Sequence, residues 1–358
     1  MIIASYNLNN LFERATILEL EGFSPTAREV LNDISKLNVL LAKDSYAGST
    51  GTAILTLIKK YFGANGKKEN KYFFINEIKN KLTGTTNGEL VLRPIGKDDW
   101  LGWIELKKST VNEAATQNTA LVVKEIKADV MCVIEVDDRI ALNNFNKYLL
   151  EKEFKYALLI DGNDERGIDV GVLSKYEVVN IETHIYDTYK DENGKTAITF
   201  SRDCAIYTIK KGNTLVYLLC NHFKSQGYGR PEDNNYKRAK QAEAVAQIIK
   251  RYNLNKDYVV IAGDLNDVPD SEPLKVLRDN NKLVNIAEQF GLEHTGTYDT
   301  GKKQFDYLWV SNALASKFVE GNIERRGIFS KKGEKFETVT SKANQASDHA
   351  AVWAKFDI

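Results

Sequence analysis

Short, almost wholly apolar runs recur along the chain, and most have the length of a β-strand. Residues 130–135 form one such run, which ends in a single carboxylate, Glu135. A central strand that is buried on both faces and opens on a site at its end has this pattern. By the same reasoning the sequence predicts further strands at residues 2–6, 155–160, 168–174, 178–186, 203–209, 214–221, 257–262, 305–310 and 350–356.

Between several of these runs, apolar side chains recur with the three- and four-residue spacing of an amphipathic helix. Helices are predicted at residues 26–43, 52–62, 71–82, 112–127, 138–151, 233–252 and 272–280, whereas residues 90–107 have an extended pattern. Strands are numerous, and some follow one another directly, as the strands of hairpins do. This order predicts an α/β sandwich with mixed sheets rather than a purely parallel, doubly wound sheet.

Composition places the chain among ordinary globular proteins. Its 358 residues include 49 basic and 49 acidic side chains, with 43% hydrophobic and 27% charged residues, which excludes extensive disorder. No stretch approaches the roughly 20 uncharged apolar residues that a membrane span requires. Because the net charge is zero, any attraction to nucleic acid must come from local patches.

The N-terminal segment and the cysteines bear on the compartment. The apolar run after Met1 is too short for a secretory signal and has no basic start, so a cytoplasmic protein is expected, or a secreted one if a leader was removed. The three cysteines stand far apart within apolar runs, and we expect free, buried thiols. They are Cys132, Cys204 and Cys220.

Polar side chains that can carry chemistry gather at the ends of the predicted strands. One such residue alone is usually a turn residue or a helix cap. Here the feature recurs on five strands besides the one that ends in Glu135, and a single edge of a sheet could gather them all. The residues are Asn7, Glu135, His222, Asp264 with Asn266, Asp306, and Asp348 with His349.

Taken in order, these segments resemble the motifs of the endonuclease/exonuclease/phosphatase superfamily, the metal-dependent phosphoesterases that include deoxyribonuclease I. The most specific are Gly263-Asp264-Leu265-Asn266-Asp267 and Ser347-Asp348-His349, while residues 221–225 are most similar to the bacterial extracellular-type nuclease branch. The resemblance implies a four-layered α/β sandwich, with two packed mixed sheets and helices outside. The matching pieces are residues 6–12, 133–136, 166–171, 221–225, 263–267, 305–307 and 347–349.

The resemblance also implies a metal site. Glu135 would be the main ligand of Mg²⁺ or Mn²⁺, both hard cations that prefer oxygen, and Asn7 would support it. Asp348 would be a second metal ligand. The family often has an acid two residues after the first asparagine, but this chain has Asn9, a neutral and weaker ligand.

Catalytic and substrate-binding roles follow from the same resemblance. Asp264 and Asn266 would orient or deprotonate the attacking water and contact the phosphate. Asp306 would accept a hydrogen bond from His349 and fix its tautomer. His222 would donate to a phosphate oxygen or to the leaving group, and the abasic-site repair branch typically has no histidine there. The substrate-binding candidates are Lys224, Arg202 and Asp169.

The implied activity is metal-dependent phosphodiester hydrolysis, with DNA as the expected substrate and 3′-hydroxyl and 5′-phosphate ends as products. One alternative is a phosphatase or phospholipase-type phosphodiesterase, which would act on a small molecule or a lipid head group with the same residues. A non-catalytic scaffold is disfavoured, because the chain retains all seven of the main site residues: Asn7, Glu135, His222, Asp264, Asn266, Asp306 and His349.

Residues 13–111 separate the first two motifs, and we expect a largely helical insertion within a single domain that spans residues 1–358. Within the insertion, residues 58–81 carry seven lysines and two glutamates, a local charge of +5. Such a segment is either a solvated face or a surface that follows the phosphates of nucleic acid. The insertion is therefore a candidate site for substrate, for a protein partner or for self-association. Further basic groups lie at residues 224–240 and at 325–332.

Overall fold

The structure is a computed structural model that describes residues 1–11, 13–15, 25–63, 69–110, 114–164, 167–191, 193–227, 229–299 and 301–358. Among the predicted motif residues and the basic side chains of the basic segments, Phe12, Lys67, Lys68 and Arg166 lie outside these ranges. The chain divides into two compact units, one formed by Met1–Phe12 with Asn112–Ile358 and the other by Glu13–Val111. That both units belong to one functional domain stays a prediction.

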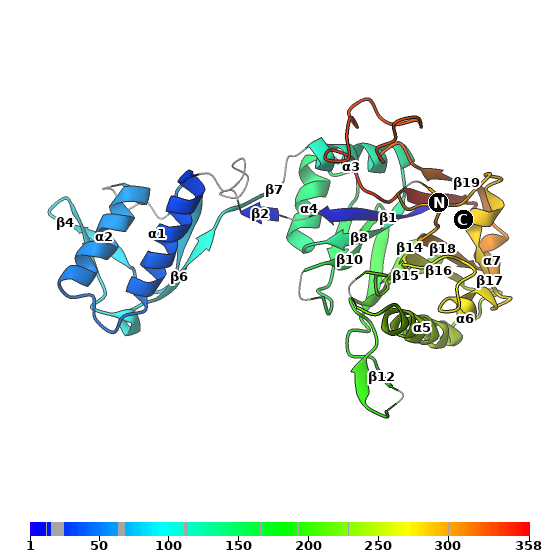
Figure 1. Ribbon diagram of the computed structural model, residues 1–358, viewed down its shortest axis with the longest axis horizontal. Coiled ribbons are helices and arrows are strands. Elements are labelled where there is room, and N and C mark those ends of the chain that lie inside the picture. Colours follow the sequence, from blue (N-terminus) through cyan, green and yellow to red (C-terminus); the bar gives the residue numbers. More distant parts are fainter. Residues whose placement is uncertain are drawn as a thin grey trace. The chain divides into compact units, whose positions relative to one another are not determined.

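The first unit contains two six-stranded mixed sheets (Figure 1). The first sheet has the order β19 (Phe318–Glu324), β20 (Ala351–Phe356), β1 (Ile2–Leu11), β8 (Val130–Val136), β10 (Asp169–Ser174) and β9 (Tyr156–Leu159). The second has the order β11 (Glu177–Glu182), β14 (Cys204–Lys211), β15 (Thr214–His222), β16 (Tyr258–Asp264), β18 (Asp306–Ser311) and β17 (Leu283–Asn285). A separate hairpin pairs β12 (Thr188–Lys190) with β13 (Thr196–Ile198).

The two sheets pack face to face and are covered by helices, which makes four layers. Alternate residues of both sheets, such as Cys132 and Leu218, form one buried core between them. The opposite face of the first sheet packs against α3 (Ala114–Ile126) and α4 (Arg139–Tyr148). The opposite face of the second sheet packs against α5 (Pro231–Ile248) and α6 (Lys275–Arg278). The expected four-layered α/β sandwich is therefore confirmed.

Local sequence explains where the main helices begin. Asp138 caps α4, because its side chain accepts a hydrogen bond from the backbone N–H of Ala141 at 2.7 Å. Helix α5 begins at Pro231, followed by Glu232 and Asp233 in its first turn, where proline and acidic residues are favoured. Short helical turns complete the unit: η3 (Ile249–Arg251), η4 (Ile286–Gln289) and α7 (Asn312–Ala315).

Most predicted strands of this unit are present, but two strands of the six-stranded sheets were not predicted, nor was the β12–β13 hairpin. Strand β19 is an edge strand, and of its seven residues only Ile323 is buried, so the sequence shows no apolar run. Strand β17 has only three residues. All three cysteines are free and buried, as predicted. Within the described residues, no helix is long and apolar enough to span a membrane.

The second unit is mixed rather than largely helical, so that prediction was wrong. It contains α1 (Pro25–Leu41) and α2 (Ser49–Phe62), with η2 (Lys97–Asp99). Three strand pairs accompany them: β2 (Glu13–Ala15) with β7 (Lys108–Thr110), β3 (Phe73–Lys79) with β6 (Leu101–Leu106), and β4 (Thr83–Thr86) with β5 (Glu89–Leu92). The predicted helix at 71–82 is strand β3. Its aromatic and β-branched residues favour a strand, and Phe73 and Ile75 alternate into a core shared with both helices.

Candidate active site

The candidate residues converge because of strand direction. Strands β1 and β8 run parallel, as do β15 and β16, so Asn7, Glu135, His222 and Asp264 all lie near carboxyl ends. Strand β18 runs antiparallel to β16, and β20 antiparallel to β1, so the residues at their amino ends meet the same edge. Those residues are Asp306, at the start of β18, and Asp348 with His349, just before β20.

Side-chain alternation then turns several of these residues into the space between the sheets. Val260 and Ala262 of β16 belong to the inter-sheet core, so Asp264 follows them on the same face. On the first sheet Asn7 projects inward, and its Nδ2 donates to Asp264 Oδ2 at 3.2 Å. His222, Asp264 and Asp306 are register partners across β15, β16 and β18, so they form a row at the end of the apolar core.

Glu135 reaches the site through a break in the regular strand. Simple alternation would place it with Met131 and Val133, which pack beneath α3 and α4. Instead Val136 joins that cluster, and Glu135 has a φ of 62°. This left-handed conformation costs a non-glycine residue roughly 1–2 kcal/mol, and such strain is found most often at functional sites. The break turns the carboxylate into a cavity at the sheet edge.

Gly263 fixes the backbone in front of Asp264. Its φ is 128°, and a Cβ at this position would lie 1.9 Å from the carbonyl oxygen of Asn221 on the neighbouring strand. Only glycine tolerates both conditions. Beyond it, Asp264 Oδ1 accepts a hydrogen bond from the backbone N–H of Asn266 at 2.8 Å. The Gly-Asp-Leu-Asn motif is therefore a tight backbone arrangement that presents Asp264.

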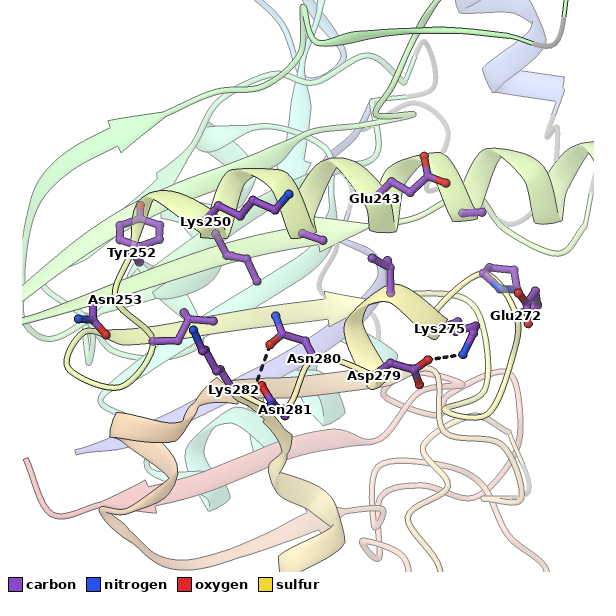
Figure 2. Close-up of a pocket in the computed structure, with 16 residues that line it drawn as sticks. Glu243, Lys250, Tyr252, Asn253, Glu272, Lys275, Asp279, Asn280, Asn281 and Lys282 are labelled. Carbon is purple, nitrogen blue, oxygen red and sulfur yellow. Dashed lines mark hydrogen bonds and ion pairs between the residues drawn. The ribbon is translucent and has the colours of Figure 1, made fainter.

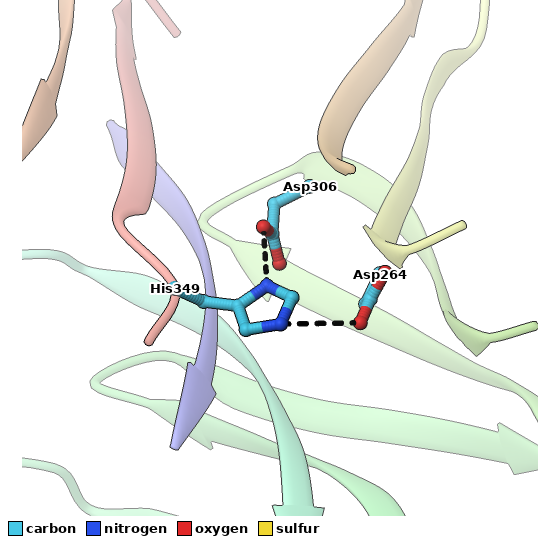
Figure 3. Close-up of side chains that lie close together, drawn as sticks. All are labelled: Asp264, Asp306 and His349. Carbon is cyan, nitrogen blue, oxygen red and sulfur yellow. Dashed lines mark hydrogen bonds and ion pairs between the residues drawn. The ribbon is translucent and has the colours of Figure 1, made fainter. Parts of the chain in front are cut away.

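His349 is held between two carboxylates (Figure 3). Its Nδ1 lies 2.8 Å from Asp306 Oδ2, and its Nε2 lies 3.8 Å from Asp264 Oδ2. Asp306 is fully buried and also accepts a hydrogen bond from Thr297 Oγ1 at 2.7 Å. The expected bond between Asp306 and His349 is thus present, and it directs Nε2 of the imidazole toward Asp264.

Burial and neighbouring charges shift the pKa values of the residues in this group. Burial alone would lower the pKa of His349, but Asp306 and Asp264 outweigh it and raise the pKa to about 10. Burial raises the pKa of Asp264 to about 7, against the opposing effect of His349. Burial also raises the pKa of Glu135, although His349 and the Asn7 amide counteract it. At neutral pH the His349 imidazole is therefore protonated, whereas Asp264 lies near the midpoint of its titration.

A cavity of about 340 Å³ opens over these groups. Of the predicted residues, Glu135, His222, Asp264, Asn266, Asp348, His349 and Arg202 line it. Two others stand behind the lining: Asn7 contacts Asp264, and Asp306 contacts His349. His222 Nε2 lies 3.8 Å from both Glu135 Oε1 and Asp264 Oδ2. The cavity therefore brings together all the predicted metal and catalytic residues.

Of the three predicted substrate-binding residues, only one lines the cavity. Arg202 lines the cavity, where its Nε lies 2.9 Å from Asp164 Oδ2. Asp169 is buried beside the lining residue Ile168 and accepts a hydrogen bond from the Gly162 N–H at 2.8 Å. Burial raises the pKa of Asp169 to about 7. Lys224 lies outside the lining, and its ammonium donates to the Gly227 carbonyl at 3.3 Å.

Several residues of the site carry no clear sequence signal. Thr297 donates to Asp306, and Tyr298 packs on the His349 ring at a centroid distance of 4.9 Å. Lys303 and Phe305 also line the cavity. Thr297, Tyr298 and Lys303 lie on a loop without hydrophobic periodicity, and Phe305 is next to Asp306. Only the closeness of these residues to Asp306 in the sequence could have indicated them.

The donor set fits a divalent cation. Glu135, Asp264 and Asp348 offer hard oxygen ligands around one cavity, the type that Mg²⁺ and Mn²⁺ prefer. Asp348 adds to the raised pKa of Glu135, and Glu135 adds to that of Asp264. A bound cation would relieve this crowding of negative charge. Asp264, Asp306 and His349 also place ligand atoms within 4.8 Å of one another, but Asp306 and His349 already bind each other.

A larger cavity, of about 1020 Å³, lies elsewhere in the same unit (Figure 2). It runs between α5 with η3 and the segment from α6 to β17, and its lining includes Glu243, Lys250, Lys275 and Asp279. Lys275 and Asp279 form an ion pair. None of the predicted site residues lines this cavity, so its size does not identify the catalytic centre.

Comparison with known proteins agrees with the motifs. The model of the endonuclease/exonuclease/phosphatase family matches residues 111–349, two thirds of the chain, and the chain belongs to this family. The family consists of hydrolytic phosphoesterases, and the matched range contains every predicted site residue except Asn7. Membership of the extracellular-type branch stays a prediction. A search of curated proteins found no match.

Solved structures with a similar fold have low sequence identity. Truncated TDP2 from Caenorhabditis elegans is 21% identical, with a TM-score of 0.47, over 68% of this chain and 89% of that one. Beta toxin from Staphylococcus aureus is 17% identical, with a TM-score of 0.48, over 68% and 93%. An endonuclease/exonuclease/phosphatase from Bacteroides vulgatus is 14% identical, with a TM-score of 0.49, over 68% and 91%.

Proposed function

We propose that this protein is a metal-dependent phosphodiesterase that hydrolyses DNA to 3′-hydroxyl and 5′-phosphate ends. The observation that carries the proposal is the buried Asp306–His349 pair, which faces Asp264 across the cavity that Glu135 also lines. Phosphodiester cleavage needs an activated water, neutralised phosphate charge and help for the leaving oxygen. The groups around this cavity can supply each of these.

Glu135 and Asn7 would hold Mg²⁺ or Mn²⁺, with Asp348 as a further ligand at the more exposed side of the cavity. The bound cation would neutralise phosphate charge as a Lewis acid. The raised pKa values of Glu135 and Asp264 support this assignment, because a cation stabilises the charged form of both carboxylates.

The protein's own groups would move the protons. Asp264, with a pKa of about 7, would orient the attacking water and accept its proton at Oδ2, and the Asn266 side chain would help place the phosphate. His349 carries a proton at neutral pH and would donate from Nε2 to a phosphate oxygen. His222 would donate to the departing O3′. Water then supplies the new oxygen of the 5′-phosphate, and O3′ leaves as a hydroxyl.

The positive charge at the cavity supports a polyanionic substrate. Lys303 lines the cavity, and Lys224 lies near its edge, next to the lining residue Ser225. Arg202 also lines the cavity and would contact the phosphate, although Asp164, at 2.9 Å, compensates its charge. Asp169 is buried behind the residues that line the cavity, so it would position the Gly162 backbone rather than contact the substrate. Hydrolysis of a phosphomonoester or of a lipid head group would use the same catalytic residues and is the alternative.

A panel of substrates separates these possibilities. The wild-type protein and Asp264→Asn would be incubated with supercoiled plasmid, with p-nitrophenyl phosphate and with a choline phospholipid, each with Mg²⁺. We expect the wild type to nick the plasmid and the variant to fail. DNA ligase should reseal the nicks, because it requires 3′-hydroxyl and 5′-phosphate ends. Turnover of the monoester or the lipid without plasmid cleavage would favour the alternative and contradict a DNA nuclease.

We also propose that residues 13–111 bind substrate or a partner. One feature limits the basic segment at residues 58–81. Lys60 is held at 2.6 Å by both Glu29 and Asp33 of α1, so its charge is compensated within the unit. Lys81 lies 3.4 Å from Glu77, so Lys59, Lys71 and Lys79 are the described lysines of this segment best suited to contact a phosphate backbone.

A further inference from the structure

A second cavity, of about 730 Å³, adjoins the catalytic one. Tyr298 lines the catalytic cavity, and Asp299, the next residue, lines the second. The backbone N–H of Asp299 donates to the carbonyl of Asp348 at 2.8 Å, and Asp348 also lines the catalytic cavity. Consecutive residues, Tyr298 and Asp299, thus line the two cavities. We call the second one the Arg325 cavity. Its basic lining residues are Arg325, Arg326, Lys331, Lys342 and His294.

Most of the charge in this cavity is compensated. Arg326 Nη2 lies 2.6 Å from Glu324 and 2.9 Å from Glu125. Lys342 lies 3.4 Å from Asp299. Ion pairs of this kind leave little net charge to attract a ligand.

Arg325 differs from its neighbours. Its Nη2 donates to two backbone carbonyls, those of Gly296 at 2.7 Å and His294 at 3.2 Å, and lies 3.4 Å from His294 Nδ1. Among the described residues, no carboxylate forms an ion pair with this guanidinium, and its buried Nε has no hydrogen-bond partner. The adjacent carboxylate, Glu324, is already bound by Arg326. Arg325 is therefore a partly desolvated cation that lacks a counter-ion.

Such an arrangement is costly unless an anion completes it. A guanidinium held by neutral carbonyls keeps its full charge, and a desolvated charge without a partner is strongly unfavourable. Consistent with this, burial lowers the pKa of Arg325. The planar guanidinium is also the side chain best matched to a phosphate group.

We propose that the Arg325 cavity binds a phosphate of the substrate strand, at a distance from the phosphate that is cleaved. This inference rests on the proposed function, because it takes the bound polyanion to be the nucleic acid that enters the catalytic cavity. Arg325 holds the phosphate, and Lys331, which is exposed on the lining of the cavity, adds to its attraction. The cavity thereby selects substrates that extend beyond the scissile group.

The direct test measures binding without turnover. Binding of a fluorescent single-stranded oligonucleotide would be measured by anisotropy, in chelator and over a range of salt concentrations. We expect Arg325→Gln to weaken binding about ten-fold, as loss of a charge-assisted contact does. The slope of log K against log salt should fall by about 0.7, the value for one phosphate contact on a single strand. Arg325→Lys should lie between the two proteins.

Lys317→Gln is the matched control, because it removes the same charge from an exposed position outside this cavity. If Arg325→Gln and Lys317→Gln have the same affinity and the same salt slope, the inference is wrong. Thermal unfolding would show whether Arg325→Gln folds. If it does not, Lys331→Gln replaces it, and an unchanged salt slope in that variant would equally overturn the inference.

Two further measurements distinguish failure of the proposed function from failure of the proposed phosphate site. Turnover of bis(p-nitrophenyl) phosphate should be unchanged in Arg325→Gln, since this small diester reaches only the catalytic cavity, whereas KM for long DNA should rise. If the wild type hydrolyses nothing and Arg325→Gln still weakens oligonucleotide binding, the proposed function fails and the phosphate site stands. If inorganic phosphate stabilises the wild type but the oligonucleotide does not bind, the cavity takes a free oxyanion, and its assignment to the substrate strand is refuted.

Discussion

Replacing Asp306 by asparagine tests the pair on which the site depends. The carboxylate is fully buried and accepts hydrogen bonds from both His349 and Thr297, at 2.8 and 2.7 Å. Its Oδ1 has no partner among the described residues, so an asparagine that keeps its oxygen toward His349 leaves a buried amide N–H₂ unsatisfied. Loss of a buried charged partner typically costs about 3 kcal/mol in the free energy of unfolding. Turnover should fall roughly 10²–10⁴-fold, the range for a positioned proton-transfer group.

The same substitution changes how stability depends on pH. In the wild type the pKa of His349 is raised to about 10, above its ordinary value of about 6.5. This interaction stabilises the fold fully below pH ~6.5 and is lost as the pH rises through about 10. Asp306→Asn removes the nearest of the three carboxylates that raise the pKa, so the difference in stability between the proteins should shrink across this window.

Chemical denaturation in chelator, repeated at several pH values, measures that difference. Histidine NMR spectra of both proteins would follow the pKa of His349 directly, and the chain has only four histidines to assign. A stability difference that stays constant from pH ~6.5 to ~10, or a His349 pKa that does not fall in Asp306→Asn, would refute the electrostatic coupling. Near-normal turnover would refute the catalytic part of the reasoning.

Other substitutions test separate parts of the site and of the second unit. Glu135→Gln should weaken binding of Mg²⁺ or Mn²⁺ in calorimetry, because the amide lacks the charge that holds a hard cation, and an unchanged affinity would remove Glu135 from this role. His222→Ala should lower turnover roughly 10²–10⁴-fold in a plasmid assay, and wild-type rates would make this histidine merely structural. Gly263→Ala should lower the free energy of unfolding by about 3 kcal/mol or more, since its Cβ would overlap the Asn221 carbonyl, and unaltered denaturation would contradict the strained turn. Lys59→Gln with Lys71→Gln should flatten the salt dependence of DNA binding by up to ~0.9 per lost contact on duplex DNA, and an unaltered slope would leave the second unit without a role in binding DNA.

The sequence predicted the sandwich and the edge that carries the site because both depend on short-range patterns. Apolar runs mark strands that are buried on both faces, as in Val130–Ile134, and a polar residue that follows such a run lies at the end of its strand. Strand direction then decides which ends meet. Asp264 and Asp306 come from antiparallel neighbours, yet they are register partners at the same edge.

Features that depend on tertiary context were not predicted. Residues 73–79 satisfy both helical and strand spacing, and only the packing of Phe73 and Ile75 against two helices favours the strand. The left-handed backbone at Glu135 depends on the pairing of β8 with both of its neighbours. Thr297 supports Asp306 from a loop, where no periodic pattern identifies a residue that contacts the site.

The most direct test of the account is a gel assay of supercoiled plasmid with Mg²⁺, with Mn²⁺ and with chelator, using the wild type and Glu135→Gln side by side. We predict conversion of the supercoiled form to nicked and linear DNA by the wild type with either cation, no conversion in chelator, and little conversion by Glu135→Gln. Undiminished cleavage in chelator, or an intact plasmid with both cations, would contradict a metal-dependent DNA nuclease.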